Sequence, residues 1–270
     1  MFAECIIALC SDSDHNTCCA GRTGENRMMK LYVLGMNGPF PEPGGATSGY
    51  LLTDGETKIC MDLGSGTLQR LTERMEPADL DLLFFTHWHY DHCSDVLTLL
   101  YRLQAEGRKL KVIGPEDASS PVRAILEKDP QVELQTAAPG DRIQIGSLTL
   151  EVFRAVHPVP ALMLRISDGK HVLCYTGDTN LQDGLDAFAS QADLLLADGL
   201  FTEEIWTGSK PHLSAKLCAE IARDAGVRRL VITHLNPFID KETLLKQARQ
   251  AYPAAELARI GMCCQIGDEG

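Results

Sequence analysis

The sequence predicts a fold of the α/β or α+β class, in which mixed β-sheets are covered by helices. Apolar segments of strand length occur early and again in the middle of the chain, and segments with helical periodicity lie between them. Glycine and proline stand at many of the junctions, which is typical of turns between short elements. No fixed-period repeat, low-complexity tract or interdomain linker is present, so the 270 residues are expected to build one main domain.

The predicted strands are short apolar runs bounded by turn residues. Two of them flank Asp54-Gly55, which is typical of a hairpin. The strands are expected at residues 30–35, 48–53, 57–61, 82–86, 109–114, 132–136, 141–145, 147–156, 161–167, 170–175, 194–197 and 229–233.

The predicted helices are marked by periodicity and by capping residues. Ser94 is the expected N-cap of the second helix, and Ser120-Pro121 opens the third with a cap and an N1 proline in the usual order. Gly226 is expected to end the fifth helix. The helices are expected near residues 67–75, from 94 to 105, from 120 onward, near 182–190, at 213–225 and at 240–251.

Residues 1–29 differ from the rest of the chain, because they are irregular and polar in the middle. We expect them to be a loosely ordered extension or an over-long reading of the start site. The ordered domain is expected over residues 30–266, with a short tail at 267–270.

Composition limits the partners of this chain. The net charge is −12 and no block of five or more basic residues occurs, which disfavours an extended nucleic-acid surface. No apolar run approaches the roughly 20 residues that span a bilayer, so no membrane contact is expected. The ten cysteines include several that stand singly in apolar segments, and the first ten residues lack the basic start of an export signal. Reduced thiols in a cytoplasmic protein are therefore expected.

The run Thr86-His87-Trp88-His89-Tyr90-Asp91-His92 places four potential metal ligands directly after an apolar strand. In an extended chain His87 and His89 point to the same side, because strand side chains alternate. Asp91 and His92 stand where a helix is expected to begin, so they can turn towards a second position nearby. This pattern predicts ligands for two adjacent metal ions.

Five further candidates stand at or near the ends of predicted elements. Asp62, His157, Asp178 and His234 each follow an apolar strand, and His212 lies in the loop before the helix at 213–225. Two divalent ions about 3.5–4 Å apart can activate a bridging hydroxide and clamp the attacking and leaving oxygens. Imidazole-rich ligation favours Zn²⁺, with Mn²⁺ and Fe²⁺ as alternatives.

These motifs resemble the metallo-β-lactamase fold superfamily over about residues 30–266. The spacing of 21 between His157 and Asp178, and Lys210-Pro211-His212-Leu213-Ser214 before a helix, are similar to the ribonuclease Z branch and its small phosphodiesterase relatives. The resemblance implies an αββα sandwich of two mixed β-sheets flanked by helices, with the metals at one edge of the sheets.

The resemblance also implies a role for each candidate. His87, His89 and His157 would hold one metal, Asp91, His92 and His234 the other, and Asp178 would bridge them. Asp91 would also orient the hydroxide or take its proton, and His212 would assist at the phosphate or leaving group. Asp62 would support the ligands from behind, although a purely structural turn is favoured there, and His212 has the alternative of a helix-capping or surface residue.

The expected function is hydrolysis of a phosphodiester by a metal-bridging hydroxide. The substrate would be an RNA end, a cyclic nucleotide or another small phosphodiester, because the 21-residue spacing leaves no room for a long tRNA-gripping arm. A homodimer is a family-level expectation. Hydrolysis of a carboxyl ester, lactone, thioester or sulfate ester is the alternative, followed by a non-catalytic metal-binding scaffold.

Neighbouring residues have plainer interpretations. Trp88 and Tyr90 are expected to face away from the metals into packing, Cys93 to be a packed side chain, and His171 to be a solvated hairpin residue. The segment at 201–206 is either a substrate lid or a loop packed on the domain.

Overall fold

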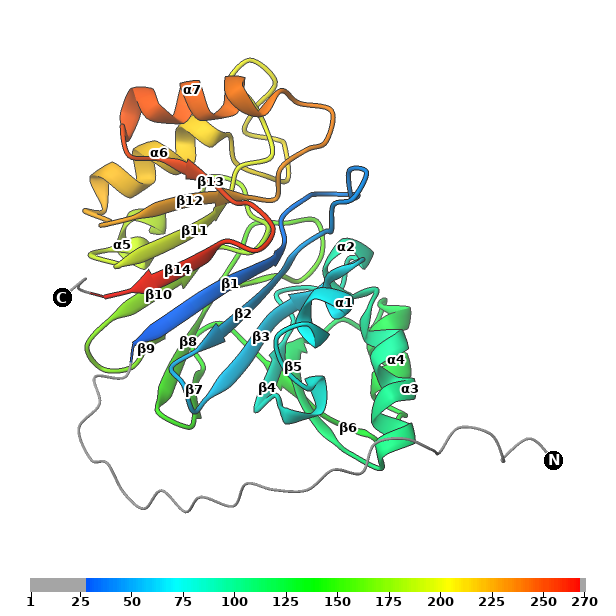
Figure 1. Cartoon of the computed structure of the whole chain (residues 1–270). Coiled ribbons are helices and arrows are strands. Elements are labelled where there is room, and N and C mark those ends of the chain that lie inside the picture. Colours follow the sequence, from blue (N-terminus) through cyan, green and yellow to red (C-terminus); the bar gives the residue numbers. More distant parts are fainter. Residues whose placement is uncertain (1–27, 268–270) are drawn as a thin grey trace.

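The computed structural model describes residues 28–267 (Figure 1). The predicted extension at residues 1–29 therefore lies outside the described residues except for Met28 and Met29, and the predicted tail is described only at Gly267. The first strand begins at Met29.

Two seven-stranded sheets form the centre of the fold, in the orders β14-β1-β2-β3-β4-β5-β6 and β13-β12-β11-β10-β9-β8-β7. Each sheet has one parallel and one antiparallel half, so both are mixed. The first sheet contains β1 (Met29–Gly35), β2 (Gly49–Thr53), β3 (Lys58–Leu63), β4 (Leu82–Phe84), β5 (Leu110–Pro115), β6 (Val132–Ala137) and β14 (Cys263–Ile266). The second contains β7 (Arg142–Ile145), β8 (Leu148–Arg154), β9 (Leu162–Ser167), β10 (Val172–Tyr175), β11 (Leu194–Asp198), β12 (Leu230–Thr233) and β13 (Glu256–Leu257).

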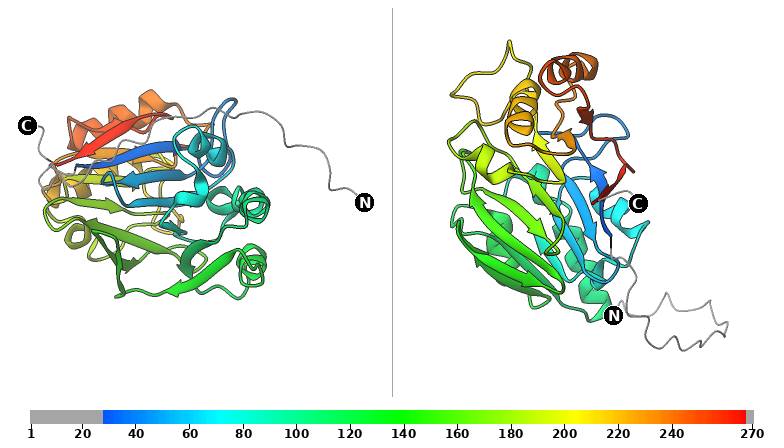
Figure 2. Two further views of the ribbon diagram at one scale, coloured as in Figure 1. Left: turned by 60° about the horizontal axis from the view of Figure 1, so that its bottom comes forward. Right: turned by 90° about the vertical axis from the view of Figure 1, so that its left-hand side faces the viewer.

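Helices cover the outer faces of both sheets, which confirms the αββα sandwich. Figure 2 shows the two sheets packed against each other from two further directions. The helices are α1 (Thr67–Thr72), α2 (Tyr90–Cys93), α3 (Val96–Glu106), α4 (Pro121–Leu126), α5 (Leu185–Ala189), α6 (Ala215–Asp224) and α7 (Lys241–Ala251), with the 3₁₀ turn η1 (Pro77–Asp79).

Period-two alternation explains how one strand serves two cores. In β3, Ile59 and Met61 face the interior between the sheets, whereas Cys60 faces the outer core under α1, α3 and α4. All three side chains are fully buried. A strand buried on both sides reads as a continuous apolar run, which is why these segments were recognisable in the sequence.

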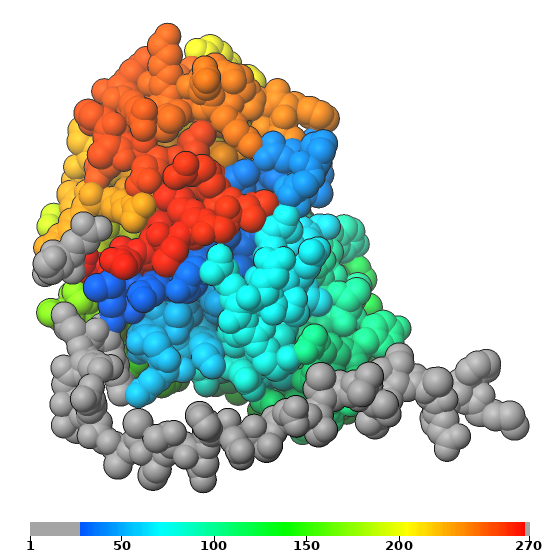
Figure 3. Space-filling model, in the orientation of Figure 1, coloured from blue at the N-terminus to red at the C-terminus, as the bar shows by residue number. Residues whose placement is uncertain are grey.

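Two predictions about local structure need correction, and two strands were not predicted. The N-cap of α3 is Asp95 and not Ser94, which instead ends α2. Tyr90 is 64% exposed and does not enter the packing that Trp88 enters, because α2 begins at Tyr90 and ends the strand alternation. The edge strands β13 and β14 were not predicted. β14 pairs with β1, so the last described residues lie beside the first, as the red and blue surfaces of Figure 3 show.

Within the described residues, no helix combines the length and apolar character needed to cross a membrane. The described cysteines are all free, and five of these six are buried.

Candidate metal centre

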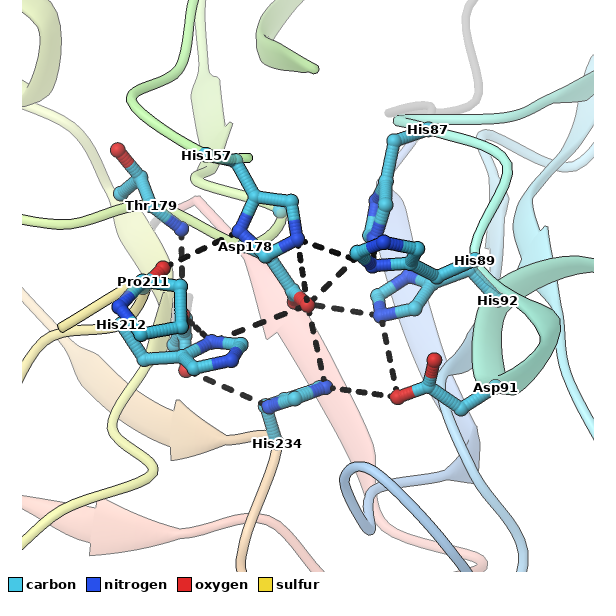
Figure 4. Close-up of polar contacts among 12 residues, drawn as sticks. His87, His89, Asp91, His92, His157, Asp178, Thr179, Pro211, His212 and His234 are labelled. Atoms are coloured by element: carbon cyan, nitrogen blue, oxygen red, sulfur yellow. Dashed lines mark hydrogen bonds and ion pairs between the residues drawn. The ribbon is translucent and has the colours of Figure 1, made fainter. Parts of the chain in front are cut away.

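The ligand-rich run lies at the end of β4, where the chain changes from strand to helix. β4 ends at Phe84, His89 is still extended, and α2 starts at Tyr90. Asp62 is the penultimate residue of β3, whereas His157, Asp178 and His234 follow β8, β10 and β12, and His212 precedes α6. The side chains of His157, Asp178, His212 and His234 converge with those of the ligand-rich run (Figure 4). Carboxyl ends of parallel strands are a common place for a site, because loops there bring side chains from several strands together.

The first group of side chains that could hold a metal ion consists of His87, His89, His157 and Asp178. Nδ1 of His89 lies 3.1 Å from Nε2 of His87 and 3.0 Å from Nε2 of His157. Oδ2 of Asp178 lies 3.6 Å from Nε2 of His87. The three rings thus point their nitrogens at one position beside the carboxylate.

The second group consists of Asp91, His92, Asp178 and His234. Nε2 of His234 lies 3.1 Å from Oδ2 of Asp91 and 3.3 Å from Oδ2 of Asp178. Nε2 of His92 lies 3.2 Å from Oδ1 of Asp178. Asp178 therefore offers its two oxygens to the space between the groups.

Electrostatics differ between the two groups. Burial lowers the pKa of His87 well below its usual value and also lowers the pKa values of His89 and His157, so these rings are held neutral. Burial also opposes charge on His234, yet the carboxylates of Asp178, Asp198 and Asp91 raise its pKa to about 10. The buried carboxylates therefore stabilise positive charge at the second group.

The donor set fits divalent metal ions. Nε2 of His92 and Nδ1 of His234 lie 3.2 Å and 3.5 Å from carboxylate oxygens of Asp178 and Asp198, but neither nitrogen forms a hydrogen bond among the described residues. Buried polar atoms in this state are costly unless something binds them. Close nitrogen–nitrogen contacts like those of His89 are also explained by convergence on a shared cation. Imidazole and carboxylate ligands together suit Zn²⁺, Mn²⁺ or Fe²⁺.

Asp62 supports this cluster from behind and is more than a turn residue. Its carboxylate is fully buried and accepts hydrogen bonds from the backbone N–H of Thr86 (2.8 Å), Nδ1 of His92 (2.9 Å) and the hydroxyl of Tyr175 (2.7 Å). Its backbone lies in the left-handed region with φ of 58°. A partner on Nδ1 fixes the orientation of an imidazole ligand, so Asp62 directs Nε2 of His92 into the cluster.

His212 lies against the cluster and is only 8% exposed. Its ring stacks on that of His234 at a centroid distance of 4.9 Å, and its Nδ1 donates a hydrogen bond of 2.8 Å to Oδ2 of Asp198. The same Nδ1 lies 3.8 Å from Oδ2 of Asp178. The helix-capping alternative is wrong, because Ser214 caps α6 through a hydrogen bond from the backbone N–H of Leu217.

Asp198, Thr86 and Tyr175 also contact the cluster and were not among the predicted site residues. Asp198 is the last residue of β11 and approaches Nδ1 of His234 at 3.5 Å as well as His212. Its position after Leu194-Leu195-Leu196-Ala197 is the same strand-end signal that identified Asp62 and Asp178. Thr86 and Tyr175 carry no comparable signal, because threonine and tyrosine are ordinary strand residues.

The backbone is strained where His234 enters the cluster. Its φ is 56°, a conformation that costs energy for a residue with a side chain and that often occurs at functional sites. Gly38 passes so close that a Cβ there would lie 2.1 Å from Cε1 of His234. The glycine-rich loop after β1 therefore leaves space for the imidazole of His234.

The structure also tests the predictions for two neighbouring residues and one segment. His171 is buried, and its ring lies 3.2 Å from Asp168, so the prediction of a solvated residue is wrong. Cys93 is a packed side chain, as expected. The 201–206 segment is packed on the domain: Nε1 of Trp206 donates to Asn180, and the backbone N–H of Glu203 donates to Gln247.

Known proteins that resemble this chain in sequence include a probable metallo-hydrolase and a ribonuclease Z. Residues 47–235 match the model of the β-lactamase superfamily domain. The chain is 30% identical over 233 residues to a probable metallo-hydrolase, YhfI, of Bacillus subtilis, covering 83% of this chain and 94% of that protein. It is 27% identical to a ribonuclease Z of Methanopyrus kandleri, covering 89% and 99% of the two chains.

Solved structures give the same picture of the fold. The crystal structure of YhfI from Bacillus subtilis superposes with a TM-score of 0.84 at 29% identity, covering 88% of this chain and 99% of the other. The short form of human tRNase Z superposes with a TM-score of 0.71 at 18% identity, covering 88% and 100%. At 18% identity, the similarity to human tRNase Z concerns the fold alone.

Proposed function

Since this chain belongs to the β-lactamase superfamily and has the metallo-β-lactamase fold, we propose that it is a metal-dependent phosphodiesterase acting on small phosphodiesters or RNA ends. The observation that carries the proposal is the buried His212–Asp198 pair beside Asp178. Such a pair offers a fixed hydrogen-bond donor next to the metal ligands, which suits protonation of a leaving oxygen.

The two ligand groups would hold two divalent ions, Zn²⁺ being favoured. His87, His89 and His157 would hold the first ion and Asp91, His92 and His234 the second, and Asp178 belongs to both ligand groups. When bound, the ions would lower the pKa of water and offset negative charge on the phosphoryl oxygens.

The side chains of this chain then supply orientation and proton transfer. Asp91, whose Oδ2 is held 3.1 Å from His234, orients the attacking water and accepts its proton. The water oxygen forms a bond to phosphorus, the bond from phosphorus to the leaving oxygen breaks, and His212 gives that oxygen a proton or hydrogen bond. Asp198 fixes the tautomer and orientation of His212.

The relatives and the charge of the chain guide the choice of substrate. Relatives of similar length are named ribonuclease Z, and solved structures with the same fold include yeast PDE1 and a diphosphatase of the PhnP family. The net charge of −12 and the short connection between His157 and Asp178 favour a small phosphodiester over a folded tRNA. A cytoplasmic location and a homodimer remain predictions.

The test is a substrate panel on zinc-loaded protein, with His212→Ala beside His171→Ala. The panel contains precursor tRNA, bis(4-nitrophenyl) phosphate, a lactone, a carboxyl ester and a sulfate ester. His171 is a matched control, because it is equally buried and also lies against an aspartate, but outside the cluster. We expect His212→Ala to lower kcat for the phosphodiester by about 10²- to 10⁴-fold with full metal content, and His171→Ala to leave it unchanged.

Two results would contradict the proposal. Faster turnover of the lactone or the carboxyl or sulfate ester than of any phosphodiester, together with no effect of His212→Ala, would favour the other hydrolase activities. A metal content far below two ions per chain after zinc loading would favour a non-catalytic scaffold.

A further inference from the structure

A cavity of about 420 Å³ adjoins the proposed metal ligands and shares His157 with them. It lies between the loop after β8 and the ends of β5 and β6. Four prolines contribute to its walls: Pro115, Pro139, Pro158 and Pro160. The volume falls in the range of roughly 300–1,000 Å³ that is usual for small-molecule sites.

The walls of this cavity are held in place by hydrogen bonds. Within the loop, the backbone N–H of Ala155 donates to the carbonyl of Ala161 at 3.0 Å. The N–H of Leu162 donates to the carbonyl of Thr86 at 2.9 Å, which ties the loop to the metal-ligand run. Proline rings add stiffness, so the cavity exists before a ligand arrives and ordering it costs little.

The polar groups of the cavity include one free cation. Among residues 28–267, the guanidinium of Arg154 has neither a hydrogen-bond nor an ion-pair partner, although it lines the cavity. Glu116 also lines it and is anchored by Arg123 and by the hydroxyl of Thr136 at 3.2 Å. The cavity thus combines apolar walls with a free donor and a fixed acceptor.

We propose that this proline-walled cavity binds the nucleoside arm of the phosphodiester, on the side that stays attached to phosphorus. The inference rests on the proposed function. A nucleobase has flat faces for apolar walls, and a nucleoside carries ring acceptors and sugar hydroxyls that Arg154 and Glu116 can bind. An alkyl arm would use the walls alone.

The retained arm fits this cavity better than the departing arm. His212, which would face the leaving oxygen, does not itself line the cavity. Its ring contacts His157, which lies at the edge that the cavity shares with the ligands, and also Phe201 and His234, which lie outside the cavity. The rival position for a base is the exposed aromatic pair Phe40 and Phe238, whose ring centroids lie 5.0 Å apart. Phe238 is 84% exposed, so this pair would leave a base open to solvent.

The experiment compares two substrates with the same leaving group on zinc-loaded protein. One is thymidine 5′-(4-nitrophenyl) phosphate and the other is methyl 4-nitrophenyl phosphate. We expect a lower KM for the nucleoside ester in the wild-type protein. Ala138→Trp, which fills the cavity from an exposed position, and Arg154→Ala should each raise that KM by about 10- to 100-fold with kcat changed less than about threefold.

Matched controls separate filling and charge from general damage. Ala254→Trp places the same ring at an exposed position outside the cavity, and Arg108→Ala removes an exposed charge at the end of α3. Both should leave the KM values of the two esters unchanged. Binding of thymidine 5′-phosphate by calorimetry should weaken in the two cavity variants and in neither control.

Different failures have different meanings. Equal KM values for the two esters in the wild-type protein would overturn the cavity assignment while leaving phosphodiesterase activity intact. A loss of the preference in Phe238→Ala, with none in Ala138→Trp, would also overturn it in favour of the aromatic pair. Absence of cleavage of both esters would overturn the proposed function, and calorimetry with thymidine 5′-phosphate would still decide the cavity assignment.

Discussion

Nδ1 of His92 lies 2.9 Å from Oδ2 of Asp62, a residue thirty positions earlier in the chain. Both side chains are fully buried. Because the same carboxylate also binds Thr86 and Tyr175, it cannot move without breaking contacts in both sheets. The orientation of one candidate metal ligand is therefore built into the core of the sandwich.

Replacing Asp62 by asparagine should weaken metal binding and stability together. Asparagine has the same shape and tolerates a φ of 58°. However, its NH₂ group is a hydrogen-bond donor and would lie against groups that are themselves donors. We expect metal affinity to fall by about 10- to 100-fold and the free energy of unfolding to fall by about 1–3 kcal/mol. Zinc titration with a competing chelator and urea denaturation measure the two effects.

Asp95→Asn is the matched control for this substitution. Asp95 is partly buried and accepts a hydrogen bond of 2.9 Å from the backbone N–H of Leu68, away from the cluster. It should lower stability without changing metal affinity. If Asp62→Asn and Asp95→Asn bind zinc equally well, Asp62 does not orient a ligand.

The convergence of the histidines and aspartates could be predicted because residues of these types are unusual directly after buried strands. Histidines and aspartates directly after apolar strands conflict with core packing, and their convergence follows from the shared edge of the sheets. The two sheets were also predictable in outline, since strands buried on both faces stand out as apolar runs.

Other features depend on contacts that no local pattern records. The burial of His171 follows from the close approach of Gly267 from the other end of the domain, where an added Cβ would lie 2.6 Å from Nε2 of His171. β14 carries three polar or sulfur side chains in Cys263-Cys264-Gln265, and it is a strand only because β1 offers a free edge. Asp198 could have been identified from its position at the end of an apolar strand. Its contact with His212 could not, because His212 lies in a loop.

Gly38→Ala should damage the centre more than its size suggests. A Cβ at Gly38 would lie within 2.4 Å of three atoms of the His234 ring, so the loop or the imidazole must move. We expect kcat/KM to fall by about 10²-fold, since a misplacement of about 1 Å can have that effect. Gly208→Ala is the control, because nothing lies within 4 Å of a Cβ there. Equal activity of the two variants would show that the loop adapts freely.

Asp198→Asn should reduce the contribution of His212 without removing the ring. The amide can turn its oxygen to Nδ1 of His212 and keep one hydrogen bond, but it loses the negative charge that favours the donor tautomer. We expect kcat for bis(4-nitrophenyl) phosphate to fall and KM to stay almost unchanged. The fall in kcat should be smaller than the fall caused by His212→Ala. Steady-state kinetics at full metal loading measure this split, and a change in KM alone would contradict a role in proton transfer.

Removing metal should lower the stability of the folded chain as well as its activity. Without cations, four carboxylates and six histidines of the cluster and its supports are packed together, and Nε2 of His92 remains without a hydrogen bond. A ligand at 100 times its dissociation constant stabilises the folded state by about 2.7 kcal/mol, which corresponds to roughly 5–10 °C in Tm for a domain of this size. Chelation should therefore lower Tm by about that amount, and added zinc should restore it.

The same measurement on two variants tests the assignment of His87. In His87→Ala the increase in Tm on adding zinc should shrink, whereas His171→Ala should keep the full increase, since His171 lies outside the cluster. An equal zinc response in both variants would contradict the assignment of His87 as a ligand, whatever the activity of either protein.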